Sequence, residues 1–183
     1  MVWQLCERYS TVSSRKGWHL IFFDMENEKI CSFFGHRDVK IDPYLFFATA
    51  NQIAKAIKFG YRTFYFGGLG DFDRLAHHIL TFLMRESPEL GIRRVFCVPQ
   101  ERDLQKESRL YRRENYEEIL YLVPSFDGWY KSIYFRNCAM IDRSDLVIFY
   151  AEERKDSGAY KAYKYAKTKK DKQIVNLWRS QHE

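Results

Sequence analysis

Residues 64–77 read FYFGGLGDFDRLAH: a short apolar strand, a glycine-rich turn and the first turns of a helix. Such a turn allows backbone N–H groups to point at an anion, and the helix N-terminus adds its partial positive charge. Phosphate is the usual anion at such a place. We therefore expect Gly67, Gly68 and Gly70 to form a phosphate-binding loop.

Strand and helix patterns alternate on both sides of this turn. The predicted strands are 30–34, 62–66, 94–98, 119–123, 146–150 and 173–177. The predicted helices are 43–59, 71–83, 131–143 and 158–169, with helical spacing also in 100–118. Strands that are apolar throughout and alternate with helices are typical of a parallel sheet covered on both faces. The expected fold class is α/β, a single Rossmann-like three-layer domain with a mostly parallel sheet.

The helix after the glycine turn shows a clear apolar face. By its spacing it is expected to bury Phe72, Leu75, Ala76, Ile79, Phe82 and Leu83. Residues 1–29 stand apart as an N-terminal extension, and the Rossmann-like domain is expected to span 30–183. The extension fits an extra edge strand, an arm or upstream sequence without structural importance, and the sequence leaves these alternatives open.

The net charge indicates the kind of partner, and the cysteine content indicates the cellular compartment. The formal net charge of +6 and the pI of about 9.1 favour anionic partners, without choosing between nucleotides and nucleic acid. The four cysteines form no CxxC pair, which indicates a reduced, cytoplasmic chain, and Cys31 and Cys97 read as buried apolar residues. No apolar run approaches the length of a membrane span. We expect no cofactor and no metal.

Right-handed crossovers place every strand-to-helix loop at one edge of a parallel sheet, where ligands bind. At the first such loop, Gly35 allows close backbone approach and Arg37 offers a fork for phosphate. His36 would bond a ribose or base, or else cap backbone. In the third loop, Ser157 and Gly158 precede a helix and offer further N–H groups to an anion.

Carboxylates and amides complete the expected site. Asp71 stands where a helix N-cap would lie, and Asp73 is expected to bind sugar hydroxyls, a loop amide or Arg37. Arg136 and Asp142 are expected to orient the sugar or base, with Asn137 beside them. Asp142 and Asp145 flank Ser144, and either one of these carboxylates turns toward this edge or Ser144 and Asp145 simply end the preceding helix.

Three motifs together resemble the YpsA-like branch of the SLOG superfamily. They are FGHR at 34–37, FGGLGDFDRLA at 66–76 and RNCAMIDRSDLVI at 136–148. The resemblance implies a Rossmann-like fold, a nucleotide-derivative pocket at the strand edge and a homodimer. The function expected first is therefore binding of a nucleotide or nucleotide-derived small molecule, as a sensor or sequestering module.

More distant relatives in that superfamily supply two alternatives. Residues 70–77 resemble a stretch of DprA, which binds single-stranded DNA. The Lonely Guy phosphoribohydrolases share the fold, but their catalytic glutamate has no counterpart in this turn, so an N-glycosidic hydrolase would rely on Asp73 or Asp142 to activate water. The insertion between Pro99 and Trp129 is rich in arginine and tyrosine. Its composition is compatible with a lid over a nucleotide, a contact between protomers or a surface that binds single-stranded nucleic acid. The arginines and tyrosines include Arg102, Arg109, Tyr111, Arg112, Arg113 and Tyr116.

Overall fold

A six-stranded parallel sheet forms the centre of the molecule. The computed structural model describes residues 11–14, 17–20, 28–99, 113–123 and 128–178. The parallel strands run in the order β6-β5-β4-β3-β7-β8. They are β3 Ile30–Gly35, β4 Thr63–Phe66, β5 Arg93–Cys97, β6 Glu118–Leu120, β7 Leu146–Tyr150 and β8 Gln173–Asn176. The predicted α/β fold class is confirmed.

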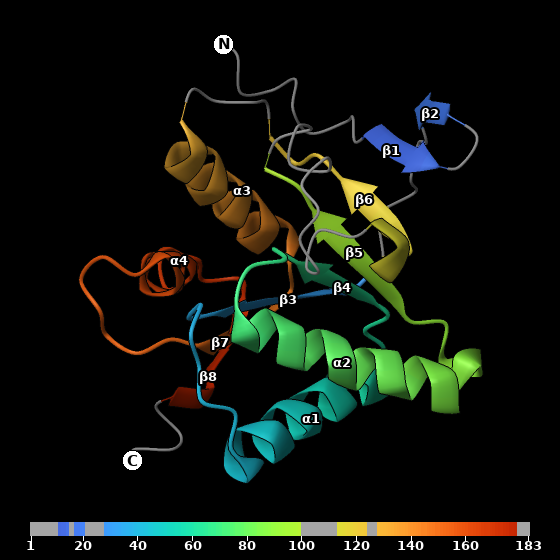
Figure 1. The fold of residues 1–183 in the computed structure, drawn as a ribbon, viewed down its shortest axis with the longest axis horizontal. Helices are drawn as coiled ribbons and strands as arrows, with labels where there is room; N and C mark the ends of the chain where they lie inside the picture. The colour runs from blue at the N-terminus through green and yellow to red at the C-terminus, as the bar shows by residue number, and fades with distance from the viewer. Residues whose placement is uncertain (1–10, 15–16, 21–27, 100–112, 124–127, 179–183) are drawn as a thin grey trace.

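Helices cover both faces of this sheet, as the uninterrupted apolar strands predict. Helices α1 (Pro43–Lys58) and α2 (Asp71–Glu86) lie on one face, and α3 (Trp129–Arg143) and α4 (Gly158–Ala166) lie on the other (Figure 1). Two short 3-10 turns, η1 (Pro88–Leu90) and η3 (Arg113–Asn115), lie in the connections. Among the described residues, no helix has both the length and the apolar character needed to cross a membrane.

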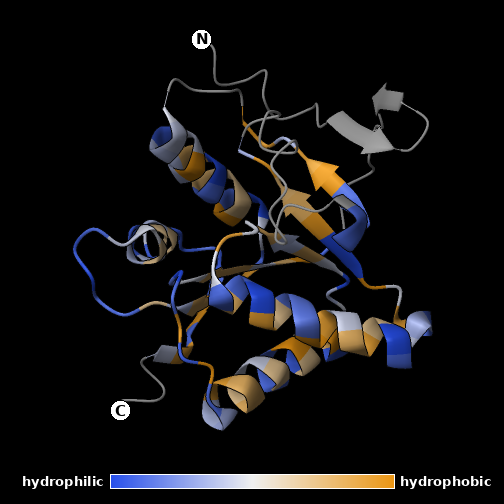
Figure 2. Ribbon diagram, viewed as in Figure 1, coloured by the Kyte–Doolittle hydropathy of each residue, from blue (hydrophilic) through white to orange (hydrophobic). Residues whose placement is uncertain are grey.

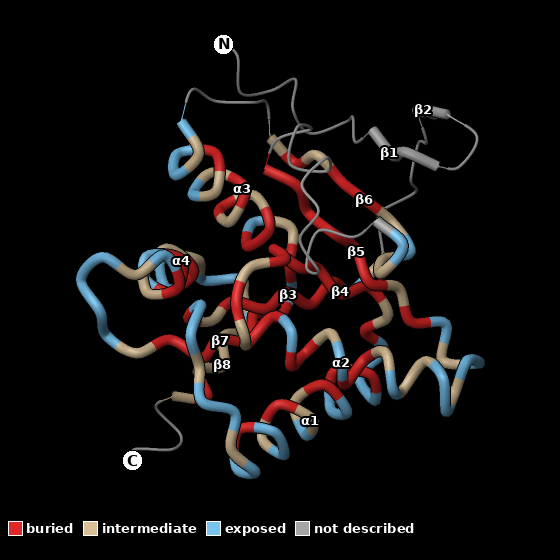
Figure 3. Tube along the Cα trace, viewed as in Figure 1, coloured by how far each residue is buried: buried red, intermediate tan, exposed pale blue. Residues whose placement is uncertain are grey.

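Successive strand residues face the two helical layers in turn. In β3, Cys31 and Phe33 belong to the core beneath α1 and α2, whereas Ile30 and Phe34 belong to the core beneath α3 and α4. Strands β5 and β6 are largely apolar (Figure 2), and β3 to β7 are almost wholly buried, whereas β8 is only partly buried (Figure 3). Cys31 and Cys97 are both 0% exposed, which confirms their prediction as buried apolar residues.

A short hairpin extends the sheet beyond β6. Strands β1 (Thr11–Ser14) and β2 (Gly17–Leu20) pair antiparallel, and Val12 of β1 lies opposite Leu120 of β6. The edge-strand alternative for the N-terminal extension is therefore the one observed at 11–14 and 17–20. The domain boundary at residue 30 stays a prediction.

The structure corrects two predictions, the burial of Phe82 and the end of the last helix, and a third falls mostly outside the described residues. Phe82 is 61% exposed, because it follows the exposed His78 by one helical turn, and Leu80 takes the buried place instead. Helix α4 ends at Ala166, three residues before the predicted end. The predicted helical segment 100–118 falls mostly on 100–112, outside the described residues, and its end forms η3 and the start of β6.

Candidate functional site

The order of the strands defines where a ligand would bind. After β3 the chain continues to β4 on one side, whereas β7 and β8 lie on the other side of β3. The crevice outside the carboxyl ends of β3 and β7 is therefore the topological switch point, the usual ligand site of open α/β sheets. The loops after these two strands, 36–42 and 151–157, border it.

His36 joins the two loops at the switch point. It is 6% exposed, and its Nε2 accepts a hydrogen bond from the Glu152 backbone N–H at 2.8 Å. Nε2 therefore carries no proton, and the protonated Nδ1 donates to Ser157 Oγ, 3.0 Å away. Ser157 Oγ also accepts from the Tyr160 N–H as the N-cap of α4. Of the two roles expected for His36, the backbone-capping one is observed.

A groove of about 300 Å³ opens beside this histidine at the same edge. It is lined by His36, Asp38, Val39, Lys40, Asp42, Tyr150, Arg154 and Trp178. The ring of Tyr150, at the end of β7, lies between the rings of Phe72 and Trp178, with centroids 5.9 Å and 5.5 Å away. Lys40 is exposed, and Arg154 pairs with Glu152 at 2.6 Å while remaining 55% exposed. The groove thus combines aromatic rings with two cations.

The glycine turn holds an anion from its own chain. Asp73 is 5% exposed, and its Oδ2 accepts a hydrogen bond from the Leu69 N–H at 3.0 Å. The backbone N–H groups of Gly68 and Gly67 also favour the charged form of this carboxylate. Burial raises the pKa of Asp73 to about 7, although these N–H groups and the charge of Arg136 act to lower it. Of the partners expected for Asp73, the loop amide is the one observed.

The glycines of the motifs are explained by packing within the fold. A Cβ on Gly35 would lie 2.3 Å from Phe72 Cβ, and one on Gly68, at φ +69°, would lie 2.6 Å from the Phe96 ring. Gly70 has φ +103° and touches the backbone of Arg37. These positions therefore require glycine for contacts inside the protein, whether or not a ligand binds.

Arg136 is buried at the same edge. It is 1% exposed, and Nη1 donates to the carbonyl oxygens of Gly67 and Cys97 at 2.8 and 2.7 Å. Its Nε donates to Asn137 Oδ1 at 2.9 Å. The guanidinium therefore ties the ends of β4 and β5 to α3 and supplies a positive charge near Asp73.

Asp71 lies one residue inside the helix that it was expected to cap. Gly70 is the N-cap of α2 and makes no side-chain capping bond, while Asp71 Oδ2 accepts from the Val39 N–H at 3.1 Å and Oδ1 pairs with Arg74. The Asp71 N–H donates to the Arg37 carbonyl at 2.8 Å. The side chain of Arg37 is exposed, and within the described segments its guanidinium has no hydrogen-bond or ion-pair partner.

Asp142 lies at the opposite edge of the sheet, contrary to the expectation. Because α3 runs antiparallel to the strands, its last turn reaches their amino ends, where Asp145 Oδ2 accepts from the Ile30 N–H at 2.8 Å. Asp142 bonds the Tyr165 hydroxyl and pairs with Lys169 at 2.6 Å. The structure thus brings the predicted residues of 35–37, 67–73, 136–137 and 157–158 to one edge and leaves Asp142 out.

Several residues of the groove were missed by sequence reasoning, among them Lys40, Arg154 and Trp178. Lys40 and Arg154 follow strands β3 and β7 at a short distance, and Trp178 comes directly after the last predicted strand. A tryptophan at the carboxyl end of a parallel strand was the available signal. Trp178 lies outside all three sequence motifs.

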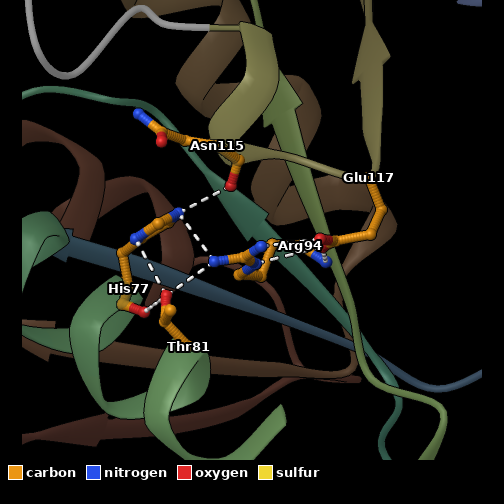
Figure 4. Close-up of polar contacts among 5 residues, drawn as sticks. All are labelled: His77, Thr81, Arg94, Asn115 and Glu117. Carbon is orange, nitrogen blue, oxygen red and sulfur yellow. Dashed lines mark hydrogen bonds and ion pairs between the residues drawn. The ribbon is translucent and has the colours of Figure 1, made fainter. Parts of the chain in front are cut away.

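A second polar cluster lies on the α2 face of β5 (Figure 4). His77 Nε2 donates to the Asn115 carbonyl at 2.9 Å, and its ring lies 5.0 Å from that of Tyr116. Arg94, 8% exposed, donates to Thr81 Oγ1 at 2.6 Å and pairs with Glu117, also at 2.6 Å. These contacts hold residues 115–117 against α2 and β5.

The neutral state of His36 predicts a specific dependence of stability on pH. Burial and the nearby Arg154 lower the pKa of His36, while Glu152 acts to raise it. The unfolded chain, with a histidine pKa of about 6.5, takes up a proton that the folded protein resists, so this contribution to stability is present above about pH 6.5 and is lost as the pH falls. We expect His36→Gln, whose carbonyl replaces Nε2 as acceptor, to reduce the loss of stability on acidification.

Denaturant unfolding of both proteins at several pH values between about 5 and 8 measures this effect. Asp73 titrates in the opposite sense, since its raised pKa favours the folded state at low pH. Both proteins retain Asp73, so the difference between the two curves isolates His36. If the difference in unfolding free energy between the original protein and His36→Gln stayed constant over this pH range, His36 would not be the source of the pH dependence.

No protein-family model and no curated protein sequence matches this chain. Solved structures do: DNA processing protein A (DprA) from Helicobacter pylori superposes with a TM-score of 0.61 at 18% identity, covering 90% of this chain and 69% of that one. DprA from Streptococcus pneumoniae gives a TM-score of 0.55 at 12% identity, covering 82% of this chain. This chain spans 50% of that protein.

At these identities the likeness concerns the fold. The chain has a Rossmann-like α/β fold that it shares with these DprA structures. Membership of the YpsA-like branch stays a prediction. Within the described part of the chain, no three side chains of His, Cys, Asp or Glu come together as metal ligands.

Proposed function

We propose that the protein binds a nucleotide or nucleotide-derived small molecule in the groove at the β3–β7 switch point. One observation carries the proposal: the groove joins the Trp178 ring to the cationic side chains of Lys40 and Arg154 at this edge. A planar ring suits a base, and cations suit phosphate. The volume of about 300 Å³ lies at the lower end of the range of small-molecule sites.

Three charged side chains of the groove have a role toward such a ligand. Lys40 and Arg154 bind phosphate oxygens, and the exposed Arg37 extends the cationic rim. Asp38 accepts hydrogen bonds from sugar hydroxyls. Asp42 is already engaged, because its Oδ1 accepts from the Leu45 N–H at 2.8 Å as the N-cap of α1.

Two features favour binding without turnover, in a sensor or sequestering module. Asp73, one of two carboxylates considered for hydrolysis, is buried and bonded to loop amides. The other, Asp142, pairs with Lys169 at the far edge of the sheet. Neither lines the groove. A YpsA-like assignment and a homodimer remain proposals that this site does not require.

Calorimetric titration with nucleoside monophosphates, dinucleotides, cyclic nucleotides and ADP-ribose tests the groove. For any compound that binds, we expect Trp178→Ala and Arg154→Gln each to weaken binding by about tenfold, the effect of losing one stacking or charge-assisted contact of about 1.4 kcal/mol. Mass spectrometry should recover the compound intact.

Matched controls are Phe82→Ala and Lys58→Gln, an aromatic and a cation exposed on α2 and α1. These controls should bind as the original protein does. The proposal would be overturned if the control variants lost as much affinity as the groove variants. It would also be overturned if the original protein bound none of these compounds. Recovery of free base would replace it with the hydrolase alternative.

A second candidate function is binding of single-stranded DNA. The structure from Helicobacter pylori describes a single-stranded DNA binding mode of its DprA, and this chain shares that fold. The formal net charge of +6 also suits a polyanion. This candidate predicts affinity that grows with oligonucleotide length and falls with salt, neither of which applies to a mononucleotide in the groove.

A further inference from the structure

Almost the whole net charge of the chain is concentrated in one segment. Residues 158–172, which comprise α4 and the turn after it, contain six lysines and one aspartate. Their net charge is +5, against +6 for the entire protein. Such a concentration on one element is the electrostatic footprint of an interaction with an anionic polymer.

Four of these lysines repeat every three residues along the segment, so that successive positions are turned by about 60° around the axis of α4. They are Lys161, Lys164, Lys167 and Lys170, and all four are exposed. Within α4 the spacing corresponds to a rise of about 4.5 Å from one lysine to the next. Lys169 and Lys172 differ, because they pair with Asp142 and Asp171 at 2.6 and 3.0 Å.

The four repeating lysines keep their charge available. No carboxylate among the described residues lies within ion-pair distance of them. Lys164 Nζ lies 5.2 Å from the centre of the Tyr160 ring, and Lys167 Nζ lies 5.9 Å from that of Tyr163. Contact with an aromatic face positions an ammonium group without neutralising it.

The neighbouring helix α3 contacts α4 and carries an exposed aromatic side chain. Asp142 of α3 contacts Tyr165 and Lys169, so its side of α3 faces α4. Tyr134 lies eight residues before Asp142 on α3, contacts the intervening Cys138 and is 43% exposed. Lysines that follow a phosphate backbone, next to rings that stack on bases, are the combination that single strands require.

We propose that the face formed by α4 and the adjoining side of α3 binds single-stranded nucleic acid, with its backbone along Lys161, Lys164, Lys167 and Lys170. The proposal rests on the second candidate function above and gives it a location separate from the groove. The lysines neutralise phosphates, and Tyr134 stacks on a base. Because four charges are involved, the logarithm of the association constant should fall with that of the salt concentration with a slope of about −3.

Fluorescence anisotropy with a labelled oligothymidylate of about 16 nucleotides measures this slope. Between about 50 and 200 mM KCl the original protein should lose about 50-fold in affinity. A triple variant, Lys161→Gln with Lys164→Gln and Lys167→Gln, should lose only about threefold over that range and bind more weakly throughout. Tyr134→Ala should weaken binding by about tenfold, and Tyr134→Phe should restore it.

The matched control removes three positive charges from the other face of the sheet. It combines Lys55→Gln, Lys58→Gln and Arg85→Gln, all exposed on α1 and α2, and should keep the slope of the original protein. Equal losses in the two triple variants would overturn the location while leaving DNA binding intact. Absence of oligonucleotide binding in the original protein, or binding only to anionic lipid vesicles, would overturn the location and the second candidate function together.

These outcomes are independent of the nucleotide groove. Trp178→Ala, which tests the groove, should leave oligonucleotide affinity unchanged, and the lysine variants should leave mononucleotide titrations unchanged. Thermal unfolding of each variant confirms that the fold persists, since exposed lysines contribute little to stability.

Discussion

Replacing Arg136 with methionine is expected to lower the free energy of unfolding by about 3–5 kcal/mol at pH 8. The guanidinium is 1% exposed and donates to the carbonyls of Gly67 and Cys97. It also supplies the positive charge beside the buried Asp73 carboxylate. Its removal leaves the carboxylate with only the N–H groups of the glycine turn to stabilise its charge, and two buried carbonyls without this donor. For a chain of this length, Tm should fall by about 6–20 °C.

The pH dependence of this loss identifies its cause. Since the pKa of Asp73 is about 7, the carboxyl group is mostly neutral at pH 5, and arginine then faces no charge. The effect of Arg136→Met should shrink there toward the cost of unsatisfied carbonyls, about 1–3 kcal/mol. Adding Asp73→Asn should recover part of the loss at pH 8. Strictly additive effects of the two substitutions would contradict a direct coupling between Arg136 and Asp73.

Gly70→Ala is expected to cost at least about 3 kcal/mol, through two effects that add. Gly70 has φ +103° and ψ 171°, a region that residues other than glycine rarely occupy. A Cβ there would also lie 2.8 Å from Arg37 Cα and 2.9 Å from the His36 carbonyl oxygen. Because both neighbours are backbone atoms, the loop 36–37 would have to shift, and ligand binding in the groove should weaken with it.

Two other glycines separate these effects. Gly91 has φ +62° but open space around its Cβ position, so Gly91→Ala should cost only about 1 kcal/mol. Gly158 has neither a positive φ nor a close neighbour, and Gly158→Ala should change stability by less than about 0.5 kcal/mol. Denaturant unfolding of the three variants measures the series. A cost for Gly70→Ala no greater than that for Gly91→Ala would mean that the contact with loop 36–37 is unimportant.

The fold could be predicted from the sequence because the patterns that specify its strands and helices lie within short stretches of the chain. Continuous apolar strands and the caps of the helices depend on short stretches, and β7 was predicted with the observed bounds, Leu146–Tyr150. Helix α1 likewise begins at the predicted Pro43, with Asp42 as its N-cap. Phe82 was misplaced because Ile79, Leu80 and Phe82 are all apolar, and spacing alone does not show which of them face the sheet.

The site was less accessible because its contacts join distant parts of the chain. A glycine turn before a helix has the same sequence whether its N–H groups bind phosphate or, as here, Asp73. The buried position of Arg136 depends on the ends of β4 and β5, far away in sequence. Asp142 follows Arg136 by six residues in one motif, but α3 runs antiparallel to the strands and carries it to the opposite edge of the sheet. The groove depends on Trp178, which belongs to no motif.

We propose that a nucleotide binds at the β3–β7 switch point rather than in the glycine turn. Nuclear magnetic resonance of the nitrogen-15-labelled protein, titrated with the tightest-binding compound of the calorimetric panel, tests this directly. We expect shifts of the Trp178 indole N–H and of the backbone amides of 36–40 and 152–157, with Gly67 and Gly68 nearly unchanged because Asp73 already occupies the glycine turn, where it accepts from the Leu69 N–H. Shifts concentrated at 67–70, with Trp178 unaffected, would contradict the proposal.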